Sequence, residues 1–310
     1  MLVILGTGGT IAGTAADAAD NVGYSAAQLG VSQLVNAVPP LAGFTLECEQ
    51  IAQIDSKDMD FATWQGLAQA VQRHLDRPEV QGIVVTHGTD TLEESAYFLQ
   101  RVLSPSKPVV LTAAMRPATA LLADGPQNLL DAVRVASHPG ATGVVCAFAG
   151  AVHSAEAIRK VHSYRVSAFA SAEGGPVALI EEGLVRGLCA WPEAETGLGL
   201  GTIARPAEHW PRVQIVMNHV GADGAVVEAL LAAGVDGIVV AGTGNGTLSK
   251  ALESALLRAR DQGVEVWLST RCDAGPVILP DPAGCPFRSA GALGPVKARI
   301  AMLLELLSRG

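Results

Sequence analysis

Two threonines that each follow a glycine-rich turn are the first residues in this chain whose type and spacing could do chemistry. Residues 6–13 read GTGGTIAG and come directly after the apolar run 2–5. Glycines at the end of a strand let backbone N–H groups approach a ligand, and α/β sheets bind ligands at that end. Thr10 would therefore offer a hydroxyl at a binding site. In the alternative interpretation, Thr7 and Thr10 only hydrogen-bond within a plain turn.

A dinucleotide-binding loop is a second alternative for this segment. It requires a helix directly after the glycines and an acidic residue after a second strand. Residues 15–24 do not resemble such a helix, and no acidic residue is clearly placed. The sequence therefore disfavours a nicotinamide or flavin cofactor.

Residues 84–94, VVTHGTDTLEE, form a second polar segment at the end of an apolar run. Thr91 and Glu94 fit a capping box, which is a purely structural explanation for part of the polarity. Thr89 and Asp90 are not needed for that cap. An ionised Asp90 beside a helix N-terminus would suit recognition of a substrate ammonium group.

The third segment, residues 156–162, contains Lys160. A lone lysine is more often a solvated surface charge. A lysine that points inward beside Thr89 could instead act as a base that activates a hydroxyl. We interpret His87 and His162 as structural histidines.

The composition favours an α/β protein that acts on a small molecule. The chain has 310 residues, 49% of them hydrophobic and only 4% aromatic, which suits strands buried on both faces. The net charge of -9, with no run of more than two basic residues, argues against nucleic-acid binding. The longest apolar stretch, residues 143–152, is about half of what a membrane span needs. We expect neither a nucleic acid nor a membrane as partner.

The N-terminus and the cysteines suggest a cytoplasmic protein. Met1 leads directly into an apolar run, without a basic segment or a cleavage site. The five cysteines are odd in number and have no CxxC spacing, so we expect neither a disulfide framework nor a metal site. They are Cys48, Cys146, Cys189, Cys272 and Cys285.

Apolar runs alternate with helical patterns, which predicts parallel sheets with crossover helices. The runs lie at residues 2–5, 83–86, 109–112, 144–148, 214–217, 237–241 and 264–268. The helical patterns cover residues 60–75, 92–103, 124–137, 224–233 and 248–262, and a last helix starts near Pro295. The Gly-, Pro- and Glu-rich residues 191–212 show neither period, so we expect a linker there between domains 1–190 and 213–310.

Four motifs occur in a fixed order along the chain. They are GGTIAG at 8–13, THGTDTLEE at 86–94, AMRP at 114–117 and ADGPQNL at 123–129. Together they resemble the bacterial-type L-asparaginases and glutaminase-asparaginases over nearly the whole chain. The resemblance implies an α/β fold with a larger N-terminal flavodoxin-like, doubly wound domain and a smaller C-terminal α/β domain. It also implies a homotetramer or homodimer with active sites between subunits.

The resemblance also implies a role for individual residues. Thr10 looks like the nucleophile and Tyr24 like its partner on a mobile lid. Thr89, Asp90 and Lys160 look like the second catalytic group. Ser56 falls at the position that binds the substrate α-carboxylate, with Lys57 beside it as a further candidate. Asp90 would hold the α-amino group, and Thr89 would also contact the substrate.

Three departures from the family pattern concern substrate preference. Lys57 stands where periplasmic members commonly have glutamine, and it adds a positive charge near the expected carboxylate site. Thr247 stands where a second asparagine often occurs; Asn245 and Thr247 are the residues we expect a neighbouring subunit to contribute. Residues 271–288 show no match to the acidic residue of that subunit.

The sequence therefore predicts a cofactor-free L-asparaginase that hydrolyses L-asparagine to L-aspartate and ammonia through a threonine acyl-enzyme. A related amidohydrolase, acting on glutamine or another small amide, keeps the same nucleophile. A non-catalytic amino-acid-binding module is the alternative from another class. Binding alone requires neither paired threonines nor a lysine beside them.

Overall fold

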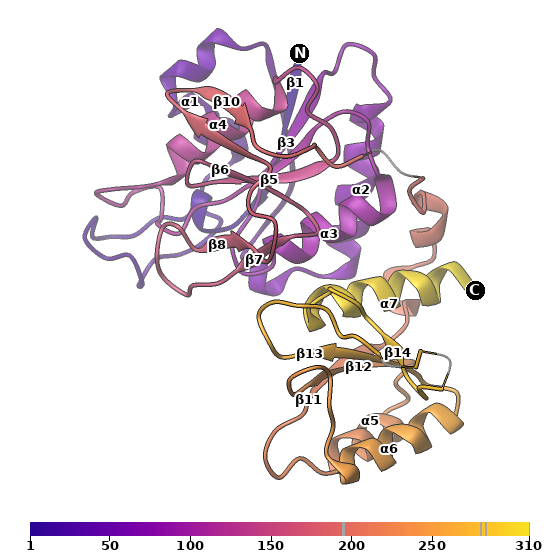
Figure 1. Cartoon of the computed structure of the whole chain (residues 1–310). Helices are drawn as coiled ribbons and strands as arrows, with labels where there is room; N and C mark the ends of the chain where they lie inside the picture. The colour runs from indigo at the N-terminus through magenta and orange to yellow at the C-terminus, as the bar shows by residue number, and fades with distance from the viewer. Residues whose placement is uncertain (194–195, 280, 283, 310) are drawn as a thin grey trace. The chain divides into compact units, whose positions relative to one another are not determined.

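The computed structural model describes residues 1–193, 196–279, 281–282 and 284–309. The chain forms two compact units, Met1–Ala204 and Arg205–Gly310, which are described separately (Figure 1). Among the described residues, every helix is too short or too polar to cross a bilayer.

The first unit is built on an eight-stranded sheet. Its strands are β1 (Leu2–Gly8), β2 (Leu46–Ile54), β3 (Gly82–Thr86), β4 (Val109–Thr112), β5 (Val144–Phe148), β6 (Ala151–Ser154), β9 (Ala178–Glu181) and β10 (Leu184–Gly187). They lie in the order β10-β9-β6-β5-β4-β3-β1-β2. The parallel part, β2-β1-β3-β4-β5, has the strand order of flavodoxin, so the predicted fold class is confirmed.

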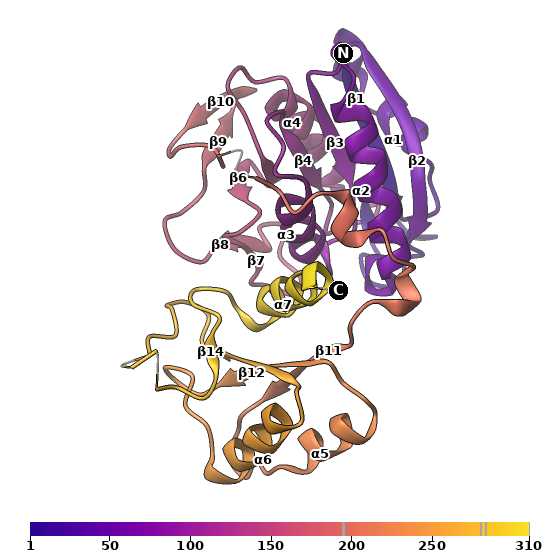
Figure 2. The ribbon, with the colours of Figure 1, turned by 90° about the vertical axis from the view of Figure 1, so that its right-hand side faces the viewer.

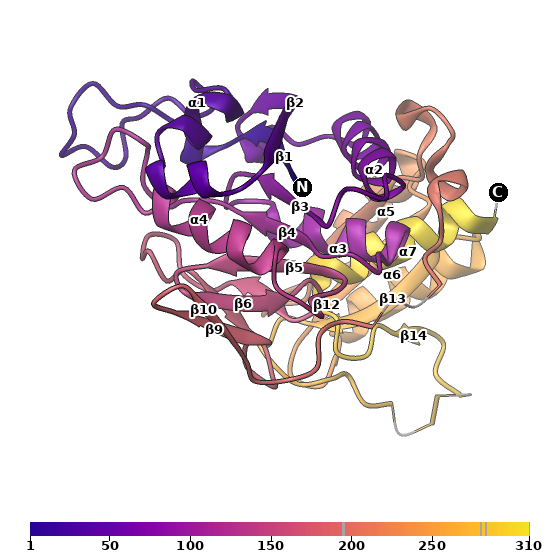
Figure 3. The same ribbon diagram turned by 90° about the horizontal axis from the view of Figure 1, so that it is seen from above.

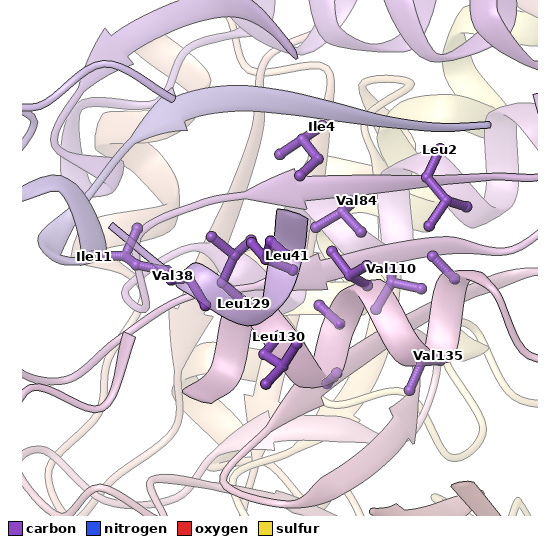
Figure 4. Packing of buried hydrophobic residues seen from close by; sticks show 14 of the residues in the cluster. Leu2, Ile4, Ile11, Val38, Leu41, Val84, Val110, Leu129, Leu130 and Val135 are labelled. Carbon is purple, nitrogen blue, oxygen red and sulfur yellow. The ribbon is translucent and has the colours of Figure 1, made fainter. Parts of the chain in front are cut away.

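Helices cover both faces of this sheet (Figure 2). They are α1 (Val31–Asn36), α2 (Phe61–Leu75), α3 (Leu92–Leu103) and α4 (Gly125–Ala136). On one face, Ile4, Val84 and Val110 of the strands belong to one apolar cluster with Leu129 and Leu130 of α4 (Figure 4). On the other face, Trp64 of α2 stacks on Phe98 of α3 with ring centroids 4.7 Å apart.

The second unit is a smaller α/β sandwich with a four-stranded parallel sheet. Its strands, in spatial order, are β11 (Val213–Met217), β12 (Gly237–Gly242), β13 (Glu265–Thr270) and β14 (Arg288–Ser289). Helices α5 (Ala225–Ala232) and α6 (Lys250–Asp261) pack on one face, and α7 (Pro295–Arg309) packs on the other (Figure 1).

One end of the large sheet is not parallel. Strands β6, β9 and β10 extend it in antiparallel pairs. Two further short strands, β7 (Ile158–Lys160) and β8 (Phe169–Ser171), pair outside it. These strands have three or four residues each, and every one contains a polar residue, so no apolar run indicates them.

Candidate active site

The two threonine turns lie at the point where the strand order of the large sheet reverses. Strands β1 and β3 are parallel neighbours, and Gly6 is paired with Thr86 at their carboxyl ends. In open α/β sheets, ligands bind outside the carboxyl ends of the strands at this switch point. The turn after β1 leads to Thr10, and the turn after β3 leads to Thr89. Both hydroxyls therefore belong to the place where the fold offers a binding site.

The backbones of these two turns touch. A Cβ atom on Gly9 would lie 2.4 Å from the Cα of Gly88, and one on Gly88 would lie 2.4 Å from Ser56 Oγ. Gly9 also has φ of 80°, a conformation that side chains rarely adopt. Only glycine fits at both positions, and the contact fixes where the next residues, Thr10 and Thr89, leave the two turns.

Thr10 is buried, with 6% of its surface exposed, and opens a 3₁₀ turn, Thr10–Ala12. Its Oγ1 lies 2.7 Å from the hydroxyl oxygen of Tyr24, in a hydrogen bond that either group can donate. Tyr24 belongs to a loop whose base is closed by two backbone hydrogen bonds between Thr14 and Ser25. The phenol is thus a proton partner for the Thr10 hydroxyl.

The loop that follows β4 holds the Tyr24 loop in place (Figure 3). Thr119 Oγ1 accepts a hydrogen bond from the Ala15 N–H at 2.8 Å and donates one to the Ala15 carbonyl at 3.3 Å. The Ala118 N–H donates to the Gly13 carbonyl at 2.9 Å. Thr119 is therefore a positioning residue for the segment between Thr10 and Tyr24. Sequence reasoning missed it because its partner is a backbone far away in the chain.

Lys160 lies beside both Thr89 and Asp90. Its Nζ donates to Thr89 Oγ1 at 2.9 Å and pairs with Asp90 Oδ1 at 2.5 Å. Only 18% of the lysine side chain is exposed, against 53% of the aspartate side chain. Since the ammonium group occupies a lone pair of Thr89 Oγ1, the threonine hydrogen is free to point into the site. The solvated-charge interpretation of Lys160 does not describe this side chain.

Ser56 connects the turn after β2 to the turn after β3. It is 2% exposed, and its Oγ accepts a hydrogen bond from the Asp90 N–H at 3.2 Å. Its carbonyl accepts a hydrogen bond from Thr91 Oγ1 at 2.7 Å. The predicted capping box of Thr91 and Glu94 is wrong, because no side-chain cap starts α3. The Thr91 hydroxyl fixes Ser56 instead.

Lys57 does not present a free positive charge. Its Nζ lies 2.5 Å from an oxygen of Asp58 and 3.6 Å from one of Asp55. The hydrogen bond with Asp58 raises the pKa of the Lys57 ammonium group. Two carboxylates therefore offset the charge that the sequence placed beside the carboxylate site.

His87 supports the turn after β3 from the interior of the first unit. It is fully buried, and burial lowers its pKa to about 4. Its Nδ1 lies 2.8 Å from the Gly88 carbonyl oxygen and its Nε2 2.9 Å from Ser95 Oγ, which also accepts from Trp64 Nε1. A neutral imidazole that donates from Nδ1 satisfies all these bonds. Such a closed network suits the structural role expected for His87.

Asn245 and Thr247 belong to the second unit, in the turn after β12. The Asn245 side-chain amide exchanges two hydrogen bonds with the backbone of Ile278, at 2.7 and 2.8 Å. The Thr247 hydroxyl lies 2.9 Å from that of Thr243. Thr247 thus holds its own turn, and Asn245 connects that turn to the segment of Ile278. Their contribution to a neighbouring site stays a prediction. In the described parts of both units, no group of three or more His, Cys, Asp or Glu could hold a metal ion.

Comparisons with known proteins agree over both units. The family model described as Asparaginase, N-terminal, matches residues 1–188, and the Glutaminase/Asparaginase C-terminal domain matches residues 212–309. L-asparaginase 2 of Escherichia coli (strain K12) is 37% identical, over 98% of this chain and 88% of that protein. Glutaminase-asparaginase of Pseudomonas fluorescens biotype A is 36% identical, over 98% and 86%.

A solved structure agrees as well. The crystal structure of a probable cytoplasmic L-asparaginase from Campylobacter jejuni superposes with a TM-score of 0.90 at 36% identity. The match covers 98% of this chain and 94% of that one.

Replacing Gly88 with alanine should disrupt the site. The new Cβ meets Ser56 Oγ and must displace it, and a shift of this size in a positioned group costs about 10²-fold in rate. We expect this loss in kcat/KM for L-asparagine, the substrate that the sequence predicts. Gly43→Ala is the matched control, because a Cβ there meets nothing within 4 Å. Equal activities of the two variants would contradict the importance of the contact.

Thr119→Val should loosen the Tyr24 loop. The variant keeps the shape of the side chain but loses both hydrogen bonds to Ala15, each worth about 1 kcal/mol. We expect kcat/KM for the same amide to fall about tenfold. Thr119→Ser retains the hydroxyl and should restore the rate. A Thr119→Val variant as active as the wild type would remove Thr119 from the positioning residues.

Proposed function

Because this chain belongs to the asparaginase family, we propose that it is a cofactor-free amidohydrolase that converts L-asparagine and water to L-aspartate and ammonia. The observation that carries the proposal is the pair of threonine hydroxyls at one switch point, each with its own proton partner. Thr10 is bonded to Tyr24, and Thr89 is bonded to Lys160. Binding alone requires neither paired threonines nor a lysine beside them.

In the first half-reaction, Thr10 Oγ attacks the side-chain amide carbon of the substrate. The Tyr24 hydroxyl, 2.7 Å away, accepts the threonine proton while it passes its own proton on towards the amide nitrogen of the substrate. The C–N bond then breaks, and the nitrogen leaves as ammonia after it gains a proton. An ester between Thr10 and the aspartyl group remains.

In the second half-reaction, water attacks the ester carbon and Thr10 recovers its proton as aspartate leaves. Both half-reactions develop negative charge on the same carbonyl oxygen. The free hydrogen of Thr89 and the backbone N–H groups of the two touching turns are donors for that oxygen. Lys160 and Asp90 hold Thr89 in position.

We assign recognition of the α-carboxylate and α-ammonium groups of the substrate to residues beside the two threonines. The Ser56 hydroxyl accepts from Asp90 N–H, so its own hydrogen is available to the α-carboxylate. The half-exposed carboxylate of Asp90 suits the α-ammonium group, and Lys57 lies next to Ser56. L-glutamine is the second candidate substrate, since a relative at 36% identity is named a glutaminase-asparaginase.

We further propose a homotetramer or homodimer in the cytoplasm. The name of the Campylobacter jejuni protein, a probable cytoplasmic L-asparaginase, supports the location. In this assembly Asn245 and Thr247 reach the site of a neighbouring subunit. The proposed domains are residues 1–190 and 213–310 with the linker 191–212, and the matched ranges 1–188 and 212–309 support these limits.

The decisive variant is Thr10→Ala, which removes the nucleophile and little volume. We expect no detectable ammonia from L-asparagine, with the fold retained in circular dichroism. Thr14→Ala, in the same loop and without a hydrogen bond from its hydroxyl among the described residues, should stay active. A Thr10→Ala variant with near wild-type rates would refute the assignment of the nucleophile.

Lys160→Met should lower kcat for L-asparagine by about 10²–10³-fold, the range for the loss of a donor to the developing oxyanion, because Lys160 positions that donor, Thr89. The loss follows because Thr89 and Asp90 lose their shared partner. Lys250→Met, an exposed lysine at the start of α6, is the control. If Lys160→Met costs less than about threefold, the lysine is only a surface charge.

A further inference from the structure

Two of the four sequence motifs, AMRP at 114–117 and ADGPQNL at 123–129, supply none of the groups assigned to the reaction. The first motif lies in the turn after β4, and the second contains the start of α4. Asp124 joins them, because its Oδ2 accepts a hydrogen bond from the Met115 N–H and its Oδ1 accepts one from the Arg116 N–H, each at 3.0 Å. One carboxylate therefore fixes two consecutive peptide groups of that turn.

Asp124 reaches back to the turn after β4 and not to its own helix. It occupies the N-cap position of α4, where an aspartate commonly accepts from the first helical turn, but its side chain makes no such bond. Asn128 Nδ2 donates to Asp124 Oδ2 at 3.3 Å and to the Ala113 carbonyl at 2.9 Å, and Asn128 Oδ1 accepts from the Ala149 N–H at 3.0 Å. Asn128 is 3% exposed, so a buried amide supports the carboxylate.

Residues 117–122 continue the turn that Asp124 holds, and they bond to the Tyr24 loop. Besides the two hydrogen bonds of Thr119 described above, the Leu121 N–H donates to the Ala18 carbonyl at 3.0 Å. All these bonds reach the part of the loop that precedes Tyr24. The position of the phenol therefore depends on the shape of residues 117–122.

The largest apolar side chains of residues 117–122 do not hold this segment in place. Leu121 is 81% exposed and Leu122 is 71% exposed, so their burial contributes little to its position. Hydrogen bonds have this role instead. The Arg116 guanidinium group donates to the Leu122 carbonyl at 2.9 Å, and Asp124 fixes the Arg116 N–H.

The start of α4 is also fixed against the turn that carries Thr10. A Cβ atom on Gly125 would lie 2.9 Å from Cγ1 of Ile11, so the helix begins in direct contact with the residue after Thr10. Asp124 immediately precedes this contact in the chain. It is therefore linked to both partners of the Thr10–Tyr24 hydrogen bond, to one through the start of α4 and to the other through residues 117–122.

We propose that Asp124 is a positioning residue for the hydrolysis proposed above. Its carboxylate sets the geometry of the Thr10–Tyr24 pair by holding the turn after β4 in the shape that bonds to the Tyr24 loop. It acts through backbone groups and transfers no proton. The effect on the rate rests on the proposed function, whereas the effect on the position of Tyr24 does not.

Fluorine NMR of protein labelled with 3-fluorotyrosine tests the proposal. The chain has three tyrosines, Tyr24, Tyr97 and Tyr164, and the resonance that Tyr24→Phe removes belongs to Tyr24. Asp124→Asn leaves one oxygen for two N–H donors, so one donor loses its partner. We expect the Tyr24 resonance to shift by more than its linewidth while the other two stay in place. An unmoved Tyr24 resonance in the folded variant would overturn the proposal.

Asp131→Asn is the matched control, since it makes the same exchange on the same helix. The partners of Asp131 are Gln127 and Arg134, both within α4, so the Tyr24 resonance should keep its wild-type position. An equal shift in this variant would assign the effect to α4 as a whole and not to Asp124.

A second variant covers the case in which Asp124→Asn does not fold. Arg116→Met removes only the hydrogen bond from the guanidinium group to the Leu122 carbonyl and leaves the buried Asn128 in place. It should shift the Tyr24 resonance as well. If that resonance does not move, residues 117–122 do not position Tyr24 and the proposal is wrong.

Kinetics with L-asparagine separate positioning from substrate binding. Asp124→Asn should lower kcat about tenfold or more, because misplacing a reacting group slows the chemical step. KM should change little, since Ser56 and Asp90 come from other turns. A normal kcat with a raised KM would contradict the positioning role. If the wild-type protein releases no ammonia from L-asparagine, the proposed function fails, and the Tyr24 resonance still decides the role of Asp124.

Discussion

The contact between Gly9 and Gly88 determines the arrangement of the threonine site. A side chain on Gly9 would overlap the backbone of Gly88, and one on Gly88 would overlap Ser56, so the two backbones can meet only as glycines. Because β1 and β3 pair in parallel, the turns that follow them lie side by side at the carboxyl ends of the strands. The end of β2 joins them, because the Gly9 N–H donates to the Ile54 carbonyl at 2.8 Å. Three strands thus present Thr10, Thr89 and Ser56 from one edge.

The groups that we propose to move protons are separate from those that only support the turns. His87 stays neutral at physiological pH because burial keeps its pKa near 4, so its bonds to Gly88 and Ser95 do not change with protonation. Lys160 comes instead from β7, outside the large sheet. The threonine site therefore combines groups at the carboxyl ends of the sheet strands with the positive charge of Lys160, which comes from a later segment of the chain.

The fold could be predicted wherever strands are buried on both faces. Strands β3, β4 and β5 consist of buried residues throughout, and their apolar runs predicted them. The edge strand β2 was missed because it is only half-buried and carries polar residues. Within the site, glycine turns after strands indicated Thr10 and Thr89. The partners of Thr91 and Thr119 could not be predicted from local patterns, since each lies more than thirty residues away. Lys160 was expected beside Thr89 and Asp90 only through the family resemblance.

The turn that carries Ser56 couples the charges of three positions. Asp55, Lys57 and Asp58 together carry one net negative charge, and their ion pairs hold the lysine within the turn. Exchanging Lys57 for an uncharged residue would leave two adjacent carboxylates beside the group assigned to the substrate carboxylate. The effect of that exchange depends on which residues occupy positions 55 and 58.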